Sequence, residues 1–412
     1  MNFWLFFVLA VIVLHFLLDT VITLLNIRAL SPELPGEFAD VYDQEKYRQS
    51  QSYTRVTSRF ALLENSISTL ITVLFLLGGG FNLVDHLVRG FGFGPIITGI
   101  LFTGAIMSLA FLLGLPFSIY STFKIEGRFG FNRTTPKVFA ADILKTLLLA
   151  VLLGTPVLAA VLWFFDQAGS YAWIYCWVGV VLFGFVLQFL APVLIMPLFN
   201  KFTPLDDGPL KEKIYAYARQ EKFTISGIFT MDGSKRSTKL NAFFTGFGRF
   251  RKIVFFDTLL EKIDADEIVA VLAHEMGHFK KRHIWKMMGA TVAQAGLMFY
   301  LLSLFLNNPG LFRAFGMDHV SIYASLFFFG FIYSPLSTLI SIVFNKMSRT
   351  HEFEADRYAA ETTGQAERLI NCLKKLSLAN LSNLTPHPAL VVYSYSHPPI
   401  LQRITALRRI KS

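Results

Sequence analysis

The sequence is poor in cysteine and in charge. Of its 412 residues only 2 are cysteines, Cys176 and Cys372, which is too few for a disulfide scaffold. Charged residues make up 16% of the chain and hydrophobic residues 53%, a balance that excludes a soluble globular protein. The formal net charge is +10, but the basic residues are dispersed and accompany no nucleic-acid-binding motif, so we expect no nucleic-acid partner. The composition predicts a chain that crosses a lipid bilayer several times.

Long apolar runs are what the sequence has in abundance. Residues 3–26 begin without a basic segment or a small-residue cleavage site, so we expect a retained spanning helix and not a signal peptide. Six further runs are long enough to cross about 30 Å of hydrocarbon. They lie at residues 66–84, 95–120, 141–165, 171–196, 284–306 and 320–344. The pattern predicts seven spans.

Basic residues are distributed unevenly between the segments that join these spans. Nearly all of them lie in four segments, at residues 27–65, 121–140, 197–283 and 345–412. The other joining segments contain only Arg89 and Arg313. Under the positive-inside rule the four basic segments are cytoplasmic and the N-terminus is outside. The organism is not encoded, so a bacterial inner membrane and an endoplasmic reticulum membrane both remain open.

The five residues from His274 to His278 form an H-E-x-x-H motif. A capping-box pattern that begins at Asp264 and the apolar run that follows it place the motif on a helix. Because residues four apart share a helix face, His274 and His278 can bind one metal ion, with Glu275 free to act on a bound water. This arrangement is typical of a zinc hydrolase. Until a third ligand is found, the motif can also be interpreted as two surface histidines beside a solvated glutamate, with no metal site.

A second stretch of the chain can supply that third ligand. Glu352 and Asp356 are four residues apart on a segment that is expected to stay helical until Gly364. Glu352 is the candidate ligand, and Asp356 the carboxylate that orients a ligand histidine. His351 and Glu354 point roughly 100° and 200° away from Glu352, so they are less suited to bind the same ion. A charged, solvated helix is the alternative interpretation.

With both motifs, HEMGH and EFEAD, the chain resembles the type 1 CaaX prenyl protease family of membrane-embedded zinc endopeptidases. Further matching stretches lie at residues 126–132 (EGRFGFN), 197–205 (PLFNKFTPL), 233–237 (GSKRS), 241–246 (NAFFTG), 253–260 (IVFFDTLL) and 395–399 (YSHPP). The resemblance implies seven helices around a large chamber, a zinc site that faces it, and removal of the C-terminal tripeptide from isoprenylated CaaX proteins. The sequence itself shows no preference for a prenyl group.

The segment at residues 197–283 is the main part outside the membrane. Runs rich in β-branched and aromatic residues at 225–231, 241–246 and 252–256 predict strands, with turn signals at 232–233 and 246–248. The expected fold class is a mainly α, polytopic membrane protein with seven transmembrane helices, a zincin-like metalloprotease site and a small cytoplasmic β-sheet. A free edge of this sheet could hold an extended substrate by strand addition.

These patterns divide the chain into four expected parts. Residues 1–200 hold five transmembrane helices with cytoplasmic loops, and 201–283 form a cytoplasmic β/helix segment with the H-E-x-x-H motif. Residues 284–345 hold transmembrane helices six and seven, and 346–412 form a cytoplasmic helical segment with the third zinc ligand.

Two further residues gain interest from the resemblance. In such proteases an asparagine and a histidine at the positions of Asn241 and His397 help to bind substrate or the developing oxyanion, a role for a hydrogen-bond donor. Without the resemblance, a histidine before two prolines is an ordinary turn residue. The remaining histidines outside the two motifs are interpreted as packing or interface residues: His15, His86, His283, His319 and His387.

The sequence thus predicts one zinc ion per chain, held by His274, His278 and Glu352, with Glu275 as the catalytic base for peptide hydrolysis. The expected partners are a peptide or protein substrate, prenylated if the resemblance extends that far, and the lipid bilayer. A membrane quality-control protease that cuts misfolded or translocation-stalled proteins is the alternative among enzymes. A third interpretation is a transporter or receptor with a structural zinc ion. Structural sites usually fill all four coordination positions with protein ligands, whereas this sequence offers three and an adjacent unpaired glutamate, which argues against this interpretation.

Overall fold

The computed structural model describes residues 2–246 and 251–410 and is mainly helical. Within this described part, seven helical stretches are long and apolar enough to cross a membrane, which confirms the number predicted from the apolar runs. They are Phe3–Arg28 (α1), Gln44–Leu77 (α2), Pro95–Glu126 (α4, Pro95–Tyr120, and a π turn), Pro136–Gln167 (α5, Pro136–Leu149, and α6, Thr155–Gln167), Gly169–Phe199 (α7, Ala172–Leu190, and α8, Met196–Phe199), His283–Phe305 (α12) and Ile322–Thr363 (α14).

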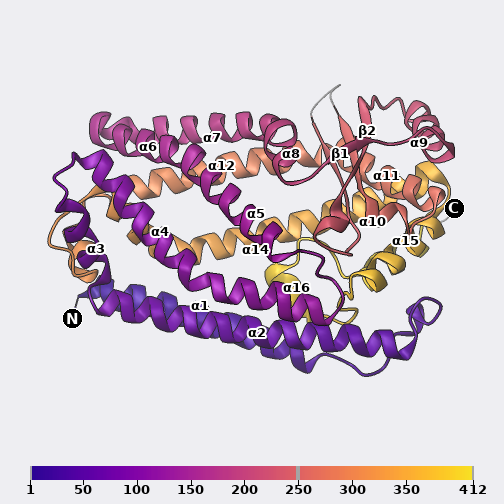
Figure 1. Ribbon diagram of the computed structural model, residues 1–412, viewed down its shortest axis with the longest axis horizontal. Coiled ribbons are helices and arrows are strands. Elements are labelled where there is room, and N and C mark those ends of the chain that lie inside the picture. The colour runs from indigo at the N-terminus through magenta and orange to yellow at the C-terminus, as the bar shows by residue number, and fades with distance from the viewer. Residues whose placement is uncertain (1, 247–250, 411–412) are drawn as a thin grey trace.

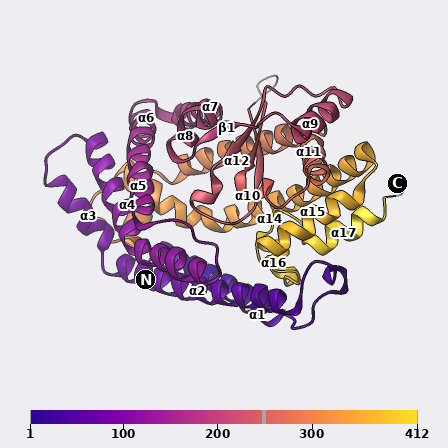
Figure 2. The ribbon, with the colours of Figure 1, turned by 45° about the vertical axis from the view of Figure 1, so that its right-hand side comes forward.

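Most of the spanning helices lie roughly along the long axis of the molecule, and α4 and α5 cross it obliquely (Figure 1). The N-terminus and the C-terminus lie at opposite ends of this axis, as an odd number of crossings requires (Figure 1). A turned view shows α1 and α2 side by side along one flank (Figure 2), and the two helices are in contact. The sheet and the remaining helices that carry the site gather at the end that holds the C-terminus.

One predicted span is wrong at its C-terminal boundary. The expected helix at residues 66–84 breaks in the structure, because α2 ends at Leu77 and α3 (Gly80–Arg89) begins after Gly79. Gly79 has φ +69°, a left-handed conformation that glycine adopts without steric cost. At its other end, α2 extends well beyond the apolar run and begins at Gln44, where Asp43 caps it.

A small mixed sheet lies at the end of the molecule that holds the C-terminus. Its strand order is β1-β2-β4-β3, with β2 (Gly227–Met231) parallel to β4 (Lys252–Phe256). β1 (Phe202–Pro204) and β3 (Ala242–Thr245) are antiparallel neighbours and form the two edges. The three strands predicted from sequence are confirmed, whereas β1 was missed because it has only 3 residues, one of them a proline. The turn expected at residues 246–248 lies largely outside the described residues.

Short helices complete this end of the chain and the far end of the bundle. They are α9 (Pro209–Gln220), α10 (Asp257–Leu260), α11 (Ala265–Lys280), α13 (Pro309–Ala314), α15 (Ala366–Ala379), α16 (Pro388–Ser394) and α17 (Ile400–Arg408). We keep the four-part division of the chain as a proposal.

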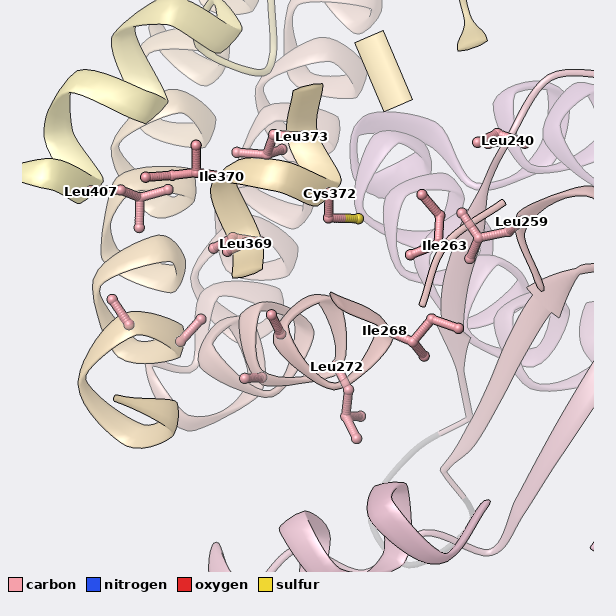
Figure 3. Close-up of a cluster of buried hydrophobic side chains, with 14 of the residues drawn as sticks. Leu240, Leu259, Ile263, Ile268, Leu272, Leu369, Ile370, Cys372, Leu373 and Leu407 are labelled. Atoms are coloured by element: carbon pink, nitrogen blue, oxygen red, sulfur yellow. The ribbon is translucent and has the colours of Figure 1, made fainter. Parts of the chain in front are cut away.

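One hydrophobic core holds α11 in place. Ile268 and Leu272 of α11 are 1% exposed and belong to the same buried cluster as Ile370 and Cys372 of α15 and Leu259 of α10 (Figure 3). Each fully buried side chain of this size contributes on the order of 1.5–3 kcal/mol through the hydrophobic effect. The helix that carries the H-E-x-x-H motif is therefore fixed by its apolar face, and the opposite face is left for chemistry.

Candidate metal centre and active site

The helix α11 begins at the capping box predicted from the sequence. Asp264 Oδ1 accepts hydrogen bonds from the backbone amides of Asp266 and Glu267 at 3.0 and 2.9 Å. The Glu267 carboxylate in turn accepts from the Asp264 amide at 3.1 Å. These bonds satisfy amides that have no partner within the helix and fix its first turn. His274 and His278 then follow on one face, one turn apart.

Three predicted ligands meet where α11 crosses α14. His274 Nε2 lies 3.2 Å from His278 Nε2, and the Glu352 carboxylate oxygens lie 3.4 and 3.3 Å from these two nitrogens. One ligand atom from each residue lies within 4.8 Å of the other two. His274 and Glu352 are buried, and His278 is partly exposed. The crossing is close because Gly277 of α11 faces Ala355 of α14.

The donor set fits a metal ion. Glu352 Oε2 is buried without a hydrogen bond, although Arg403 Nη1 lies 3.2 Å away. His274 Nδ1 lies 2.8 Å from Asp356, so the lone pair of a neutral His274 is on Nε2 and faces the lone pairs of His278 and Glu352. A cation between these groups removes their mutual repulsion. Two histidines and one carboxylate also match the ligand set of a catalytic zinc site with one open position.

Without a cation, a proton can take its place. Burial lowers the pKa of His274, but the Asp356 and Glu352 carboxylates beside its ring outweigh burial and raise the pKa to about 9. The two carboxylates therefore favour a positive charge at this ring. The site is built to stabilise a cation at this position.

Asp356 is held by an arginine that the sequence analysis did not identify. Arg403 of α17 donates to both Asp356 oxygens, from Nε at 2.8 Å and from Nη2 at 2.6 Å. Asp356 in turn contacts His274 Nδ1, so a buried chain of charges supports the ring. A signal was present in the sequence: Arg403 lies on the apolar face of α17 between Ile400, Ile404 and Leu407, where a buried charge needs a partner.

His283 was interpreted from the sequence as a packing residue without partners, and the structure corrects this. It lies at the start of α12 and contacts both His278 and Glu354. His351 stacks on its ring with 4.0 Å between centroids. His351 and Glu354, which were ranked below Glu352 as ligands, thus lie beside the three-residue group and not in it.

Glu275 lies at a cavity of about 830 Å³. His278 lines the same cavity, as do Phe244 and Thr245 at the end of the edge strand β3. Its walls continue along α7 and α12. The carboxylate expected to act as base therefore faces a space that is large enough for a peptide segment.

The structure brings His397 to the three-residue group but leaves Asn241 apart from it. His397 Nε2 lies 3.3 Å from Glu352 Oε1, and its side chain is 65% exposed. Asn241 is exposed at the start of β3, where its Oδ1 accepts from the Ala242 amide at 2.9 Å. Among the described residues, no hydrogen bond or ion pair joins Asn241 to His274, His278 or Glu352. The proximity of His397 was not readable from spacing, because 45 residues separate it from Glu352.

A His-His-Glu group beside a glutamate-lined cavity, in a chain whose described part has seven helices apolar enough to cross a membrane, defines a membrane metallopeptidase. Residues 204–411 match the model of peptidase family M48, and residues 23–201 match the CAAX prenyl protease N-terminal domain of five membrane helices. The chain belongs to peptidase family M48, and the predicted family is confirmed.

Relatives and a solved structure agree with this assignment over nearly the whole chain. The CAAX prenyl protease 1 homolog of Arabidopsis thaliana is 37% identical and covers 97% of this chain and 96% of its own. CAAX prenyl protease 1 of Saccharomyces cerevisiae is 35% identical, with 91% and 88% covered, and the human homolog is 32% identical, with 92% and 89% covered. The crystal structure of S. mikatae Ste24p superposes with a TM-score of 0.94 at 32% identity, with 98% and 99% covered.

Proposed function

We propose that this protein is an integral-membrane zinc endopeptidase that removes the C-terminal tripeptide of isoprenylated CaaX proteins or peptides. The names of its relatives support the substrate class. The single observation that carries the proposal is the cavity beside Glu275, which Glu275 and His278 line together with mostly apolar side chains of α7 and α12.

The apolar walls suit a lipid chain attached to a peptide. The cavity is lined from α7 and α12 by Val180, Val181, Phe185, Met288, Val292 and Ala295. An isoprenyl group leaves water for such a surface with a gain of about 0.8 kcal/mol for each buried CH₂. The peptide portion can extend along β3, whose outer edge has no strand partner in the described sheet. The lipid and the peptide would then place the scissile bond near Glu275.

His274, His278 and Glu352 would hold one zinc ion. Bound zinc supplies Lewis-acid polarisation of the scissile carbonyl and a more acidic water. Glu275 takes the proton from the attacking water and passes it to the leaving amine. Asp356 accepts the Nδ1 proton of His274 and keeps its Nε2 free as a ligand. His397, whose Nε2 lies 3.3 Å from Glu352 Oε1, would donate to the developing oxyanion, and Asn241 would help to bind the substrate strand.

The catalytic end would face the cytoplasm, with the N-terminus on the outside. The four basic segments connect the spans at the end that holds the sheet, which supports this orientation under the positive-inside rule. Both a bacterial inner membrane and an endoplasmic reticulum membrane satisfy the same rule.

The test is cleavage of a farnesylated CaaX peptide beside its unprenylated twin by the detergent-solubilised protein, with Glu275→Gln as the control. We expect cleavage of the farnesylated peptide between the cysteine and the next residue, and no product with the variant. Equal cleavage of both peptides, or cleavage of unfolded chains alone, would favour membrane quality control as the function.

A further inference from the structure

The ring of His278 contacts a second histidine on the side away from the candidate metal. His278 Nδ1 lies 3.0 Å from His283 Nδ1. On its other side, His283 Nε2 lies 2.8 Å from Glu354 Oε2. The His283 side chain is 3% exposed, and that of Glu354 is 42% exposed. A continuous hydrogen-bonded chain therefore runs from His278 to a carboxylate at the edge of solvent.

The direction of each hydrogen bond in this chain follows from the ligand role of His278. A nitrogen that binds a metal must present a lone pair, so a His278 that binds through Nε2 carries its proton on Nδ1. That proton is donated to His283 Nδ1, which must therefore be the acceptor. His283 then carries its own proton on Nε2 and donates it to Glu354. With these protonation states, each hydrogen bond between His278, His283 and Glu354 has one donor and one acceptor.

We propose that His283 and Glu354 are positioning residues that fix the ring orientation and the tautomer of His278. The two ligand histidines are thus supported differently: His274 bonds to Asp356 directly, whereas His278 reaches Glu354 through a second imidazole. Partners of this kind hold a ligand ring in place and raise its basicity. The inference rests on the proposed function only in that His278 must be a metal ligand.

The backbone between the two histidines is shaped for this contact. Helix α11 ends at Lys280, and α12 begins at His283. Arg282 between them has φ 59° and ψ 31°, a left-handed conformation that is uncommon for a residue other than glycine. This residue turns the chain so that the ring of His283 returns to His278, and the ring of His351 covers it in a parallel stack at 9°. Uncommon backbone conformations of this type are concentrated at functional sites.

The experiment measures zinc affinity and needs no substrate. Zn²⁺ is titrated into metal-stripped protein in competition with a chromophoric chelator. We expect His283→Ala to weaken zinc binding by about 10–100-fold. Glu354→Ala should weaken it in the same direction, whereas Glu354→Gln should retain most of the affinity because its amide oxygen still accepts from His283 Nε2.

A pair of similar substitutions separates positioning from packing. In His283→Asn the side-chain oxygen stands near the place of Nδ1 and can accept from His278, whereas in His283→Gln the amide reaches towards Glu354 instead. If the hydrogen-bond relay from His278 through His283 to Glu354 positions the ligand, the Asn variant should bind zinc more tightly than the Gln variant. If His283 only fills space, the two variants should bind zinc equally well. His351→Phe keeps the stack and removes no hydrogen bond, so it is the matched control and should bind zinc normally.

Two results would overturn the inference. If His278→Ala loses zinc while His283→Ala and the Asn and Gln variants all bind it as the wild type does, the relay is refuted and the metal site stands. If His278→Ala itself binds zinc normally, the ligand assignment fails, and the proposed function fails with it. Should His283→Ala not fold, the comparison of Glu354→Ala with Glu354→Gln decides.

Discussion

Gly277 of α11 is in direct contact with the backbone of Ala355 of α14. A Cβ atom added at Gly277 would lie 2.9 Å from the Ala355 Cα and 3.1 Å from its carbonyl oxygen. Neither atom belongs to a side chain that can rotate away, so a substitution must separate the helices. The position of Glu352 relative to His274 and His278 depends on this contact, because the carboxylate and the imidazoles come from the two opposing helices.

Gly277→Ala is therefore expected to damage the metal site without touching a ligand. Overpacking of this kind costs on the order of 1–3 kcal/mol of stability. We expect a lower melting temperature and a zinc content below one ion per chain, measured by thermal unfolding and by metal analysis of the purified protein. Gly289→Ala in α12 is the control, because a Cβ there meets no atom within 4 Å. Normal zinc binding by Gly277→Ala would show that the helices separate at no cost to the site.

Glu275→Gln should abolish turnover and leave zinc bound. The carboxylate faces the cavity and is expected to act only as a base, so its loss should lower the rate by roughly 10²–10⁴-fold. His274→Ala and Glu352→Ala should lose the metal as well as the activity. Peptidase rates and zinc stoichiometry on the same preparations separate the two classes. A Glu275→Gln protein with the normal rate would refute the assignment of the base.

Arg403→Ala should destabilise the whole catalytic end. It leaves the buried carboxylates of Asp356 and Glu352 without their shared partner, and breaking a buried ion pair on one side costs about 3–5 kcal/mol. Arg403→Lys should recover part of this loss, since a lysine keeps the charge and cannot donate to both Asp356 oxygens in the same way. Thermal unfolding of the metal-free proteins provides the comparison. Equal melting temperatures for wild type and Arg403→Ala would contradict the role of this residue.

Zinc affinity should depend on pH through His274. In the metal-free protein the pKa of this histidine is about 9, raised from 6.5. Its protonated form stabilises the metal-free fold fully below pH 6.5, and this contribution is lost as the pH rises through 9. Zinc must displace the same proton, so its affinity should increase up to about pH 9 and level off above it. Competition titrations between pH 7 and 10, with an indicator for proton release, measure both effects. A flat profile would show that His274 is neutral in the metal-free protein.

Most of the correct predictions rest on patterns within short segments of the sequence. The helix that holds His274 and His278 could be predicted because its capping box and its i, i+4 spacing lie within sixteen residues of chain. The seven spans followed from apolar length alone. Glu352 was found because it lies four residues before Asp356 on a segment that was expected to be helical, so one helix face could supply both a ligand and a supporting carboxylate.

The remainder depends on contacts between segments that are distant in the sequence. Arg403 lies 129 residues from His274, and His283 lies 71 residues from Glu354, so no spacing rule connects them. The contact of His283 with His278 also needs the left-handed turn at Arg282, which no sequence signal marked. The break at Gly79 was missed because apolar residues continue on both sides of it.

Helix α14 has a consequence for the membrane in which the enzyme works. Its 42 residues form one helix from Ile322 to Thr363, with Pro335 inside it, and this helix joins an apolar half to the turn that holds Glu352. At 1.5 Å per residue the helix is about 63 Å long, roughly twice the thickness of the hydrocarbon layer. In a thicker bilayer the helix would stand more upright, and in a thinner one it would tilt and bring the cleavage site closer to the lipid headgroups. Under the proposed function, hydrophobic mismatch would set the height at which a substrate chain is cut, so we expect bilayer thickness to influence which substrates reach the site.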